Sequence, residues 1–185
     1  MSPSQPPVPE PVDPSGIHAV AWRDARLDLL DQRRLPADLR RVVCEDVDAV
    51  ILCIRDMVVR GAPAIGVAAA YGAVLAARQR VAAQGADWLA GFRADLGRLR
   101  EARPTAVNLA WAVDRMLASA ATAGADPETA LLAEARRIHA EDITMNQAMA
   151  VLGADLIGAR GSVITHCNAG ALATGGLGTA LGVIR

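Results

Sequence analysis

The stretch SVITHCNAGALATGGLGTALG, residues 162–182, decides how the rest of the chain is interpreted. Val163 and Ile164 are β-branched and follow a Gly-Ser pair, a pattern typical of a short strand. The small residues from Ala169 onward are typical of the start of a helix. A strand that leads directly into a helix opens a parallel α/β unit, so the stretch predicts the beginning of an α/β domain.

Cys167 lies where the predicted strand gives way to the predicted helix. The first turn of a helix has unpaired N–H groups and the positive end of the backbone dipole, and both attract anions. A thiol held there tends toward the thiolate, which makes Cys167 a candidate reactive side chain. The alternative is a buried, inert cysteine, because free cysteine is among the most buried residue types.

Composition excludes several classes of function. The 185 residues are 52% hydrophobic and only 3% aromatic, with a formal net charge of -1. These values give no reason to expect nucleic acid or an anionic membrane surface as a partner. All 19 basic side chains are arginine, so Schiff-base lysine chemistry and a lysine phosphate clamp are excluded. We expect any phosphate to be held by arginine and backbone N–H groups.

Metal, disulfide and membrane signals are weak. Cys44, Cys53 and Cys167 form no C-x-x-C pair, and three scattered histidines show no metal-ligand spacing, so we predict no metal site and no disulfide scaffold. The uncharged runs 61–77 and 162–184 are too short or too polar to predict a membrane span. Nothing resembles a signal peptide, so a cytoplasmic location is predicted.

Taken in order, the chain divides into four parts. Residues 1–15 are proline-rich and predict a disordered tail. Residues 16–125 predict an α+β N-terminal domain with a small antiparallel sheet and helices, residues 126–160 a long connecting helix, and residues 161–185 the start of the second domain. Strands are expected at 17–22, 27–30 and 41–44, and helices at 48–59, 63–81, from 88, from Pro104 and from 126 to about 157.

Two arginines stand beside proline-opened helix junctions. Arg60-Gly61-Ala62-Pro63 places a glycine suited to a left-handed residue at the end of one helix and a proline in the first turn of the next. Arg103 precedes Pro104 in the same way. The junctions predict either parts of an anion pocket or simple tight turns.

Three further ionisable residues receive structural interpretations. Asp142 interrupts the apolar stripe of the long helix, and we expect its carboxylate to point to solvent at a helix bend, with a buried group near a site as the alternative. His139 and His166 are expected to be hydrogen-bonded structural histidines.

Several motifs, in order along the chain, resemble the methylthioribose-1-phosphate isomerase family, which is related to the regulatory subunits of the translation-initiation exchange factor. The likeness covers everything after the tail. It depends on the opening 22–36 with Leu29-Leu30-Asp31-Gln32-Arg33, and on four further motifs: Arg60-Gly61-Ala62-Pro63-Ala64-Ile65-Gly66, Arg103-Pro104-Thr105-Ala106-Val107-Asn108-Leu109, residues 142–146 and Thr165-His166-Cys167-Asn168-Ala169-Gly170-Ala171-Leu172-Ala173-Thr174.

The resemblance implies an isomerase of methionine salvage that converts the aldose 5-methylthioribose 1-phosphate into the ketose 5-methylthioribulose 1-phosphate. It implies an α+β domain followed by a Rossmann-like domain, usually in a homodimer, without metal or organic cofactor. Arg60, Gly61, Ala62 and Arg103 would bind the sugar phosphate, and Cys167 would be catalytic.

The sequence departs from this family in one respect. The aspartate that partners the family's cysteine has no counterpart before Arg185, so we expect the 185-residue chain alone to be inactive. The predicted α/β unit also lacks further parallel strands and its pattern stops at Arg185 inside the last predicted helix, so the Rossmann-like domain is expected to be truncated and the isolated chain to aggregate or expose a large apolar face. A regulatory initiation-factor subunit and a ribose-1,5-bisphosphate isomerase remain the alternative functions.

Overall fold

The computed structural model describes residues 17–157 and 161–185. The predicted tail, residues 1–15, lies outside the described residues. Three strands form an antiparallel sheet in the order β1-β2-β3: β1 (Val20–Arg23), β2 (Arg26–Leu30) and β3 (Arg41–Cys44). The predicted small antiparallel sheet is confirmed, although its first strand begins at Val20 rather than at residue 17.

The sheet register follows from its turn and its apolar residues. Asp24 and Ala25 both have positive φ, as a tight two-residue hairpin requires, and they pair Val20 with Leu29 across β1 and β2. Leu27 and Leu29 are fully buried on the face toward the helices. The alternation of period two therefore places one face of the sheet on the core.

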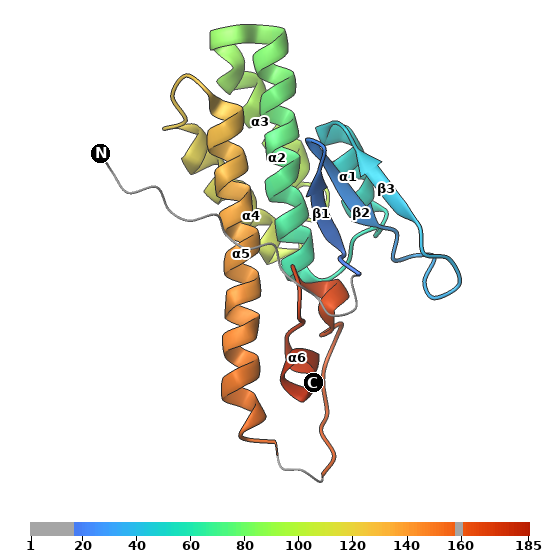
Figure 1. The fold of residues 1–185 in the computed structure, drawn as a ribbon. Coiled ribbons are helices and arrows are strands. Elements are labelled where there is room, and N and C mark those ends of the chain that lie inside the picture. The colour runs from blue at the N-terminus through green and yellow to red at the C-terminus, as the bar shows by residue number, and fades with distance from the viewer. Residues whose placement is uncertain (1–16, 158–160) are drawn as a thin grey trace.

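One helix forms the centre of the fold (Figure 1). The alanine-rich helix α2 (Ala62–Gln84) is buried without interruption from Ala64 to Ala77, as its uniform composition predicts. It contacts the sheet and the surrounding helices, which are α1 (Val47–Arg55), α3 (Trp88–Arg100), α4 (Val107–Ala120) and α5 (Pro127–Ala154). A short 3-10 turn, η1 (Gly85–Asp87), joins α2 to α3.

The predicted opening of α5 is confirmed, whereas that of α4 is wrong. The Asp126 carboxylate accepts a hydrogen bond from the Thr129 N–H at 3.1 Å, and Pro127 occupies the first turn of α5. Pro104 does not begin α4. The Ala106 N–H instead donates to the Arg103 carbonyl at 2.9 Å and closes a turn, so the helix begins only at Val107.

The predicted strand and helix of residues 162–182 do not form. Residues 161–166 have no secondary structure, and only η2 (Ala171–Ala173) and α6 (Ala180–Ile184) follow. A parallel strand needs neighbouring strands, and among residues 17–157 and 161–185 the only sheet is β1-β2-β3. Gly175, Gly176 and Gly178 also disfavour a continuous helix because glycine loses the most backbone entropy. The start of a Rossmann-like domain is therefore not observed.

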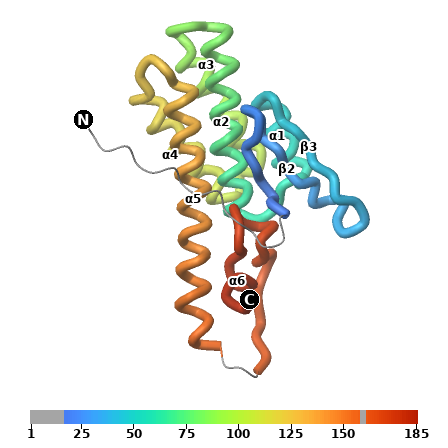
Figure 2. Tube along the Cα trace, viewed as in Figure 1, coloured from blue at the N-terminus to red at the C-terminus, as the bar shows by residue number. Residues whose placement is uncertain are grey.

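The segment after residue 161 runs back along the C-terminal half of α5 toward the start of α2 (Figure 2). A β-carbon on Gly153 of α5 would lie 2.5 Å from Val183, which shows how closely α6 packs there. The same half of α5 exposes Met145, Met149 and Leu152, and Leu156 just beyond the end of the helix is also exposed. None of the helices in the described part of the chain has the length and apolar character needed to cross a bilayer.

Candidate functional site

Arg60 and Gly61 connect α1 to α2. Helix α1 is closed by Met57, which has a φ of 59° and whose N–H donates to the Ile54 carbonyl. Gly61, with a φ of 94°, caps the start of α2 instead of the end of α1, and its carbonyl accepts from Ile65. The prediction that Gly61 ends the first helix is therefore wrong, but a positive φ at this residue is confirmed.

Glycines bring three distant segments together at the start of α2. A β-carbon on Gly61 would lie 2.5 Å from the β-carbon of Ala173, and one on Gly66 would lie 3.0 Å from the Asn108 carbonyl oxygen. Real β-carbons essentially never approach another atom as closely as 2.5 Å, so Gly61 could not carry a side chain here without a shift of the backbone. The Arg60 junction, the Arg103 junction and the segment after Cys167 consequently share one region of the molecule.

Cys167 is solvent-exposed and has a φ of 62° at a bend. It does not begin a helix, since η2 starts four residues later at Ala171. The alternative of a buried cysteine is therefore wrong, and so is the expected activation of the thiol by a helix start. The first buried residue after Cys167 is Ala169.

The segment after Cys167 is fastened to the sheet side of the fold. The Gln32 side chain donates to the Leu172 carbonyl at 2.8 Å, while the Gln32 N–H donates to the Val58 carbonyl at 3.0 Å. Buried Thr174 accepts hydrogen bonds at its Oγ1 from the N–H groups of Gly176 and Gly178, both at 3.1 Å. These contacts fix the turn that carries Ala173 to Gly61.

Helix α5 holds the same segment from the other side. The Asp142 carboxylate accepts from the Gly175 N–H at 2.6 Å, so the expected solvent-facing position of Asp142 is wrong. Burial raises the pKa of Asp142, and the Gly175 hydrogen bond partly opposes this. The expectation for His139 is confirmed, because its Nε2 lies 2.9 Å from the Gly175 carbonyl and its Nδ1 lies 3.2 Å from the Tyr71 hydroxyl.

His166 does not match its expectation. It lies in the exposed stretch before Cys167, and no hydrogen bond joins it to any other residue in the described part of the chain. A structural role for this side chain is therefore wrong.

Arg60 and Arg103 carry unneutralised charge next to this region. Arg60 is exposed and Arg103 is half-buried, and neither forms an ion pair with any carboxylate of residues 17–157 or 161–185. Arg115, by contrast, is paired with Glu134 and Glu141. Both junction arginines are therefore available to an anionic ligand.

A cavity of about 340 Å³ opens between the starts of α2 and α4 and the middle of α5. Asp142 is the one ionisable side chain in its wall. Arg115 lies nearby over the Trp111 ring at 5.4 Å, but its charge is balanced by its two glutamates. The wall is otherwise apolar or neutral, formed by Pro63, Gly66, Val67, Val107, Asn108, Trp111, Ile138 and Met145.

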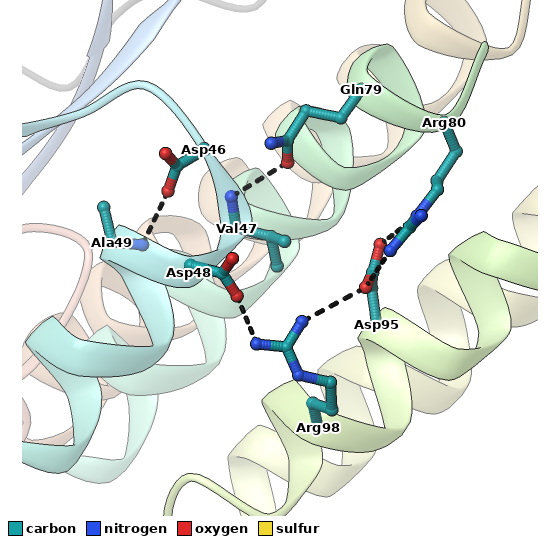
Figure 3. A network of polar contacts seen from close by, with 8 residues as sticks. All are labelled: Asp46, Val47, Asp48, Ala49, Gln79, Arg80, Asp95 and Arg98. Carbon is teal, nitrogen blue, oxygen red and sulfur yellow. Dashed lines mark hydrogen bonds and ion pairs between the residues drawn. The ribbon is translucent and has the colours of Figure 1, made fainter. Parts of the chain in front are cut away.

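A second polar cluster lies at the opposite end of α2 (Figure 3). Buried Asp95 accepts from Arg80 at 2.6 and 2.8 Å and from Arg98 at 3.3 Å, and Arg98 also contacts Asp48. The Val47 N–H donates to the Gln79 side chain at 3.2 Å. Each of these charges is paired, so the cluster ties α1, α2 and α3 together.

The described residues offer no metal site. Among residues 17–157 and 161–185, no group of three or more histidine, cysteine, aspartate or glutamate side chains is placed to hold an ion. Cys44 and Cys53 are buried with their sulfur atoms 3.6 Å apart, and both are free thiols.

Comparison with known proteins defines the family. The sequence profile described as the Initiation factor 2 subunit family matches residues 58–185. The chain belongs to this family. Among curated members, the methylthioribose-1-phosphate isomerase of Alkalilimnicola ehrlichii is 58% identical over 169 residues, and that of Methylococcus capsulatus is 52% identical over 171. These alignments cover 91% and 92% of the chain but 49% of each relative, so the chain spans about half the length of the relatives.

Two solved structures resemble the fold. The 5-methylthioribose 1-phosphate isomerase of Pyrococcus horikoshii aligns with a TM-score of 0.82 and 36% identity over 90% of this chain and 48% of that one. The translation initiation factor eIF-2B subunit delta of A. fulgidus aligns with a TM-score of 0.77 and 38% identity over 92% of this chain and 50% of that one. The two neighbours have the same fold and different names.

Sequence reasoning missed the contacts that hold this family member's loop. Asp142 and His139 stand three residues apart on α5, a spacing that places both side chains on one helix face. Two polar residues on an otherwise apolar stripe were the available signal. Their partner, the Gly175 peptide, could not be identified because backbone groups leave no pattern in a sequence.

Proposed function

We propose that the chain contributes the N-terminal half of a methylthioribose-1-phosphate isomerase, an aldose-ketose isomerase of methionine salvage. The observation that carries the proposal is the meeting of three segments at the start of α2, where Gly61 packs on Ala173 and Gly66 on Asn108. The names of relatives that are 52–58% identical support the same reading.

Each proposed site residue has a physical role. Arg60 and Arg103 have no carboxylate partner in the described structure, and their guanidinium groups would bind the phosphate through charge-assisted hydrogen bonds. Backbone N–H and carbonyl groups at Gly61 and Ala62 would hold the sugar at close range, because neither residue presents a bulky side chain. Cys167, which is exposed and precedes Ala173 by six residues along the chain, would take part in proton transfer or stabilise the transition state.

The reaction explains why such a site is needed. The phosphate on C1 blocks ordinary opening of the sugar ring, so the enzyme must break a C1–O bond and move hydrogen from C2 to C1. An acid near the ring oxygen and a base near C2 would serve an enediol route, and a hydride shift would need the same charge stabilisation. The thiol of Cys167 would act at one of these two positions.

The cavity beside the junctions favours a substrate with an apolar 5-substituent. Its wall has no cationic side chain, and ionised Asp142 would repel a second phosphate. Trp111 and Met145 offer aromatic and thioether surface, which suits a methylthio group. The charge of the wall therefore disfavours ribose 1,5-bisphosphate as the substrate.

A regulatory subunit of a translation initiation factor is the second candidate. The structural neighbour named eIF-2B subunit delta, at 38% identity, favours this alternative. Such a subunit would bind a partner protein and would need neither a free Arg60 nor an exposed Cys167. Tight binding to an initiation factor without binding to a sugar phosphate would support it over the isomerase.

The cellular location, oligomeric state, cofactor requirement and partners are proposed from the same family resemblance. We propose that the protein acts in the cytoplasm as a homodimer at full length, without metal or organic cofactor and without a nucleic-acid partner. The isolated 185 residues would not turn over substrate.

Kinetics of the full-length gene product test the isomerase. Arg60→Ala and Arg103→Ala should each lower kcat/KM by roughly 10- to 100-fold, the range expected for losing a hydrogen bond to a charged group. Arg93→Ala is the matched control, because Arg93 is an exposed arginine of α3 without an ion pair in the described structure. No turnover of methylthioribose 1-phosphate by the full-length protein would refute the proposal.

A further inference from the structure

Residues 169–178 depend on outside contacts for their shape. The segment contains one 3-10 turn, η2, and one isolated bridge between Gly170 and Gly178. Neither feature stabilises a particular position relative to α2, since both lie within the segment. Contacts from other elements must therefore decide where the segment sits.

Helix α5 contacts both backbone polar groups of Gly175, which belong to the two peptide units on either side of its Cα. Asp142 accepts from the Gly175 N–H at 2.6 Å, and the Nε2 of His139 lies 2.9 Å from the Gly175 carbonyl oxygen. The two side chains come from adjacent turns of the same helix. Gly175 therefore cannot rotate or slide without breaking at least one of these hydrogen bonds.

Close packing reinforces the two hydrogen bonds between α5 and Gly175. A β-carbon on Gly175 would lie 2.5 Å from His139 Cδ2 and 3.1 Å from Asp142 Oδ2, so only glycine fits between the two side chains. A β-carbon on the next residue, Gly176, would likewise lie 3.1 Å from Cγ1 of Ile143. The backbone of the segment is thus in direct contact with α5.

Tyr71 sets the orientation of the imidazole. Because His139 Nε2–H must donate to the Gly175 carbonyl, its Nδ1 is free to accept from the Tyr71 hydroxyl at 3.2 Å. Burial lowers the pKa of His139 and favours this neutral form, and the charged or titratable groups around it are Asp142, His18 and Tyr71. Helices α2 and α5 are in this way joined through one histidine.

We propose that His139 and Asp142 are positioning residues that hold the backbone N–H and carbonyl of Gly175 and thereby fix how residues 167–174 approach Gly61. Ala173, which packs on Gly61, stands only two residues before Gly175, so a displacement of Gly175 moves Ala173 with it. This inference rests on the proposed function, in which the same segment brings Cys167 to the substrate.

Paired substitutions at His139 separate positioning from general stability. His139→Ala removes the donor to Gly175, whereas the amide N–H of His139→Gln can still reach the same carbonyl. His139 does not line the 340 Å³ cavity, so its replacement does not alter that wall directly. Asp142→Ala and Asp142→Asn form a second pair, since the asparagine oxygen can still accept from the Gly175 N–H.

Amide hydrogen exchange and kinetics of the full-length gene product provide the test. In both alanine variants we expect exchange of the Gly175, Gly176 and Gly178 amides to rise at least about tenfold while α3 exchanges as before. We expect kcat to fall at least about tenfold, and the glutamine and asparagine variants to recover most of both losses.

Three results would overturn the proposal: unchanged exchange in the alanine variants, faster exchange spread equally over α3, or no recovery in the conservative variants. If the unsubstituted protein lacks isomerase activity, the proposed function fails, and the exchange measurement alone then decides whether α5 positions this segment.

Discussion

Gly61 and Ala173 are packed so closely that a β-carbon on Gly61 would lie 2.5 Å from the β-carbon of Ala173. This contact joins the start of α2 to the turn η2. It also explains why the residue beside Arg60 must be glycine, for which a φ of 94° adds a second reason.

Gly61→Ala should therefore displace the segment that contains Cys167. We expect the substitution to lower the melting temperature by several degrees and to weaken binding of methylthioribose 1-phosphate at least about tenfold, because strain and collision act together. Gly85→Ala is the matched control: its φ of 56° is also positive, but a β-carbon there meets nothing within 4 Å. Equal effects of the two substitutions on binding would contradict the importance of the contact.

Asp95→Asn should destabilise the opposite end of α2. The buried carboxylate accepts from both Arg80 and Arg98, and the loss of its charge weakens both interactions. We expect the free energy of unfolding to fall by about 2 kcal/mol in urea titrations. Asp48→Asn, which changes an exposed pair with Arg98, should cost less than about 1 kcal/mol, and a reversal of this order would refute the assignment.

Acid should weaken the contribution of His139 to stability. Burial lowers the pKa of His139 below its usual 6.5, so the unfolded chain takes up a proton that the folded chain resists. The contribution of His139 to the free energy of unfolding is fully present above about pH 6.5, and it is lost as the pH falls through the pKa of the folded state. Half-buried Asp142 contributes in the opposite direction, since its raised pKa makes the folded state bind a proton more readily as the pH falls.

The comparison of His139→Gln with the unsubstituted protein isolates this effect. Urea unfolding at pH 7.5, 6.5 and 5.5 should show the stability advantage of His139 over glutamine shrinking as the pH falls. Parallel curves for the two proteins would show that the imidazole does not titrate in the expected direction.

Local signals in the sequence were sufficient for much of the fold. The strand Arg41–Cys44 and the opening of α5 at Asp126 appear where side-chain pattern and capping chemistry predict them. The uniform alanine content of α2 correctly indicates burial on most faces. These features depend on residues close in sequence, so they can be inferred without knowledge of the tertiary structure.

The failures have a tertiary origin. Val163 and Ile164 have strong strand propensity, but a strand requires a neighbour, and the described part of the chain offers none beside them. Asp142 seemed solvated because its partner is a backbone N–H 33 residues away. The roles of Arg60, Arg103 and Cys167 came from family resemblance, and their contact with substrate remains a prediction.

Protection of Cys167 from alkylation tests most directly whether the two arginines and this thiol share one site. Cys167 is the exposed cysteine, while Cys44 and Cys53 are buried, so iodoacetamide labelling followed by mass spectrometry reports on it selectively. In the full-length gene product, we predict that methylthioribose 1-phosphate slows labelling of Cys167 in a saturable manner, and that Arg60→Ala and Arg103→Ala each shift this protection to at least about tenfold higher ligand concentration. Labelling unaffected by the sugar phosphate, or protection in both arginine variants at the same ligand concentration as in the unsubstituted protein, would contradict a shared site.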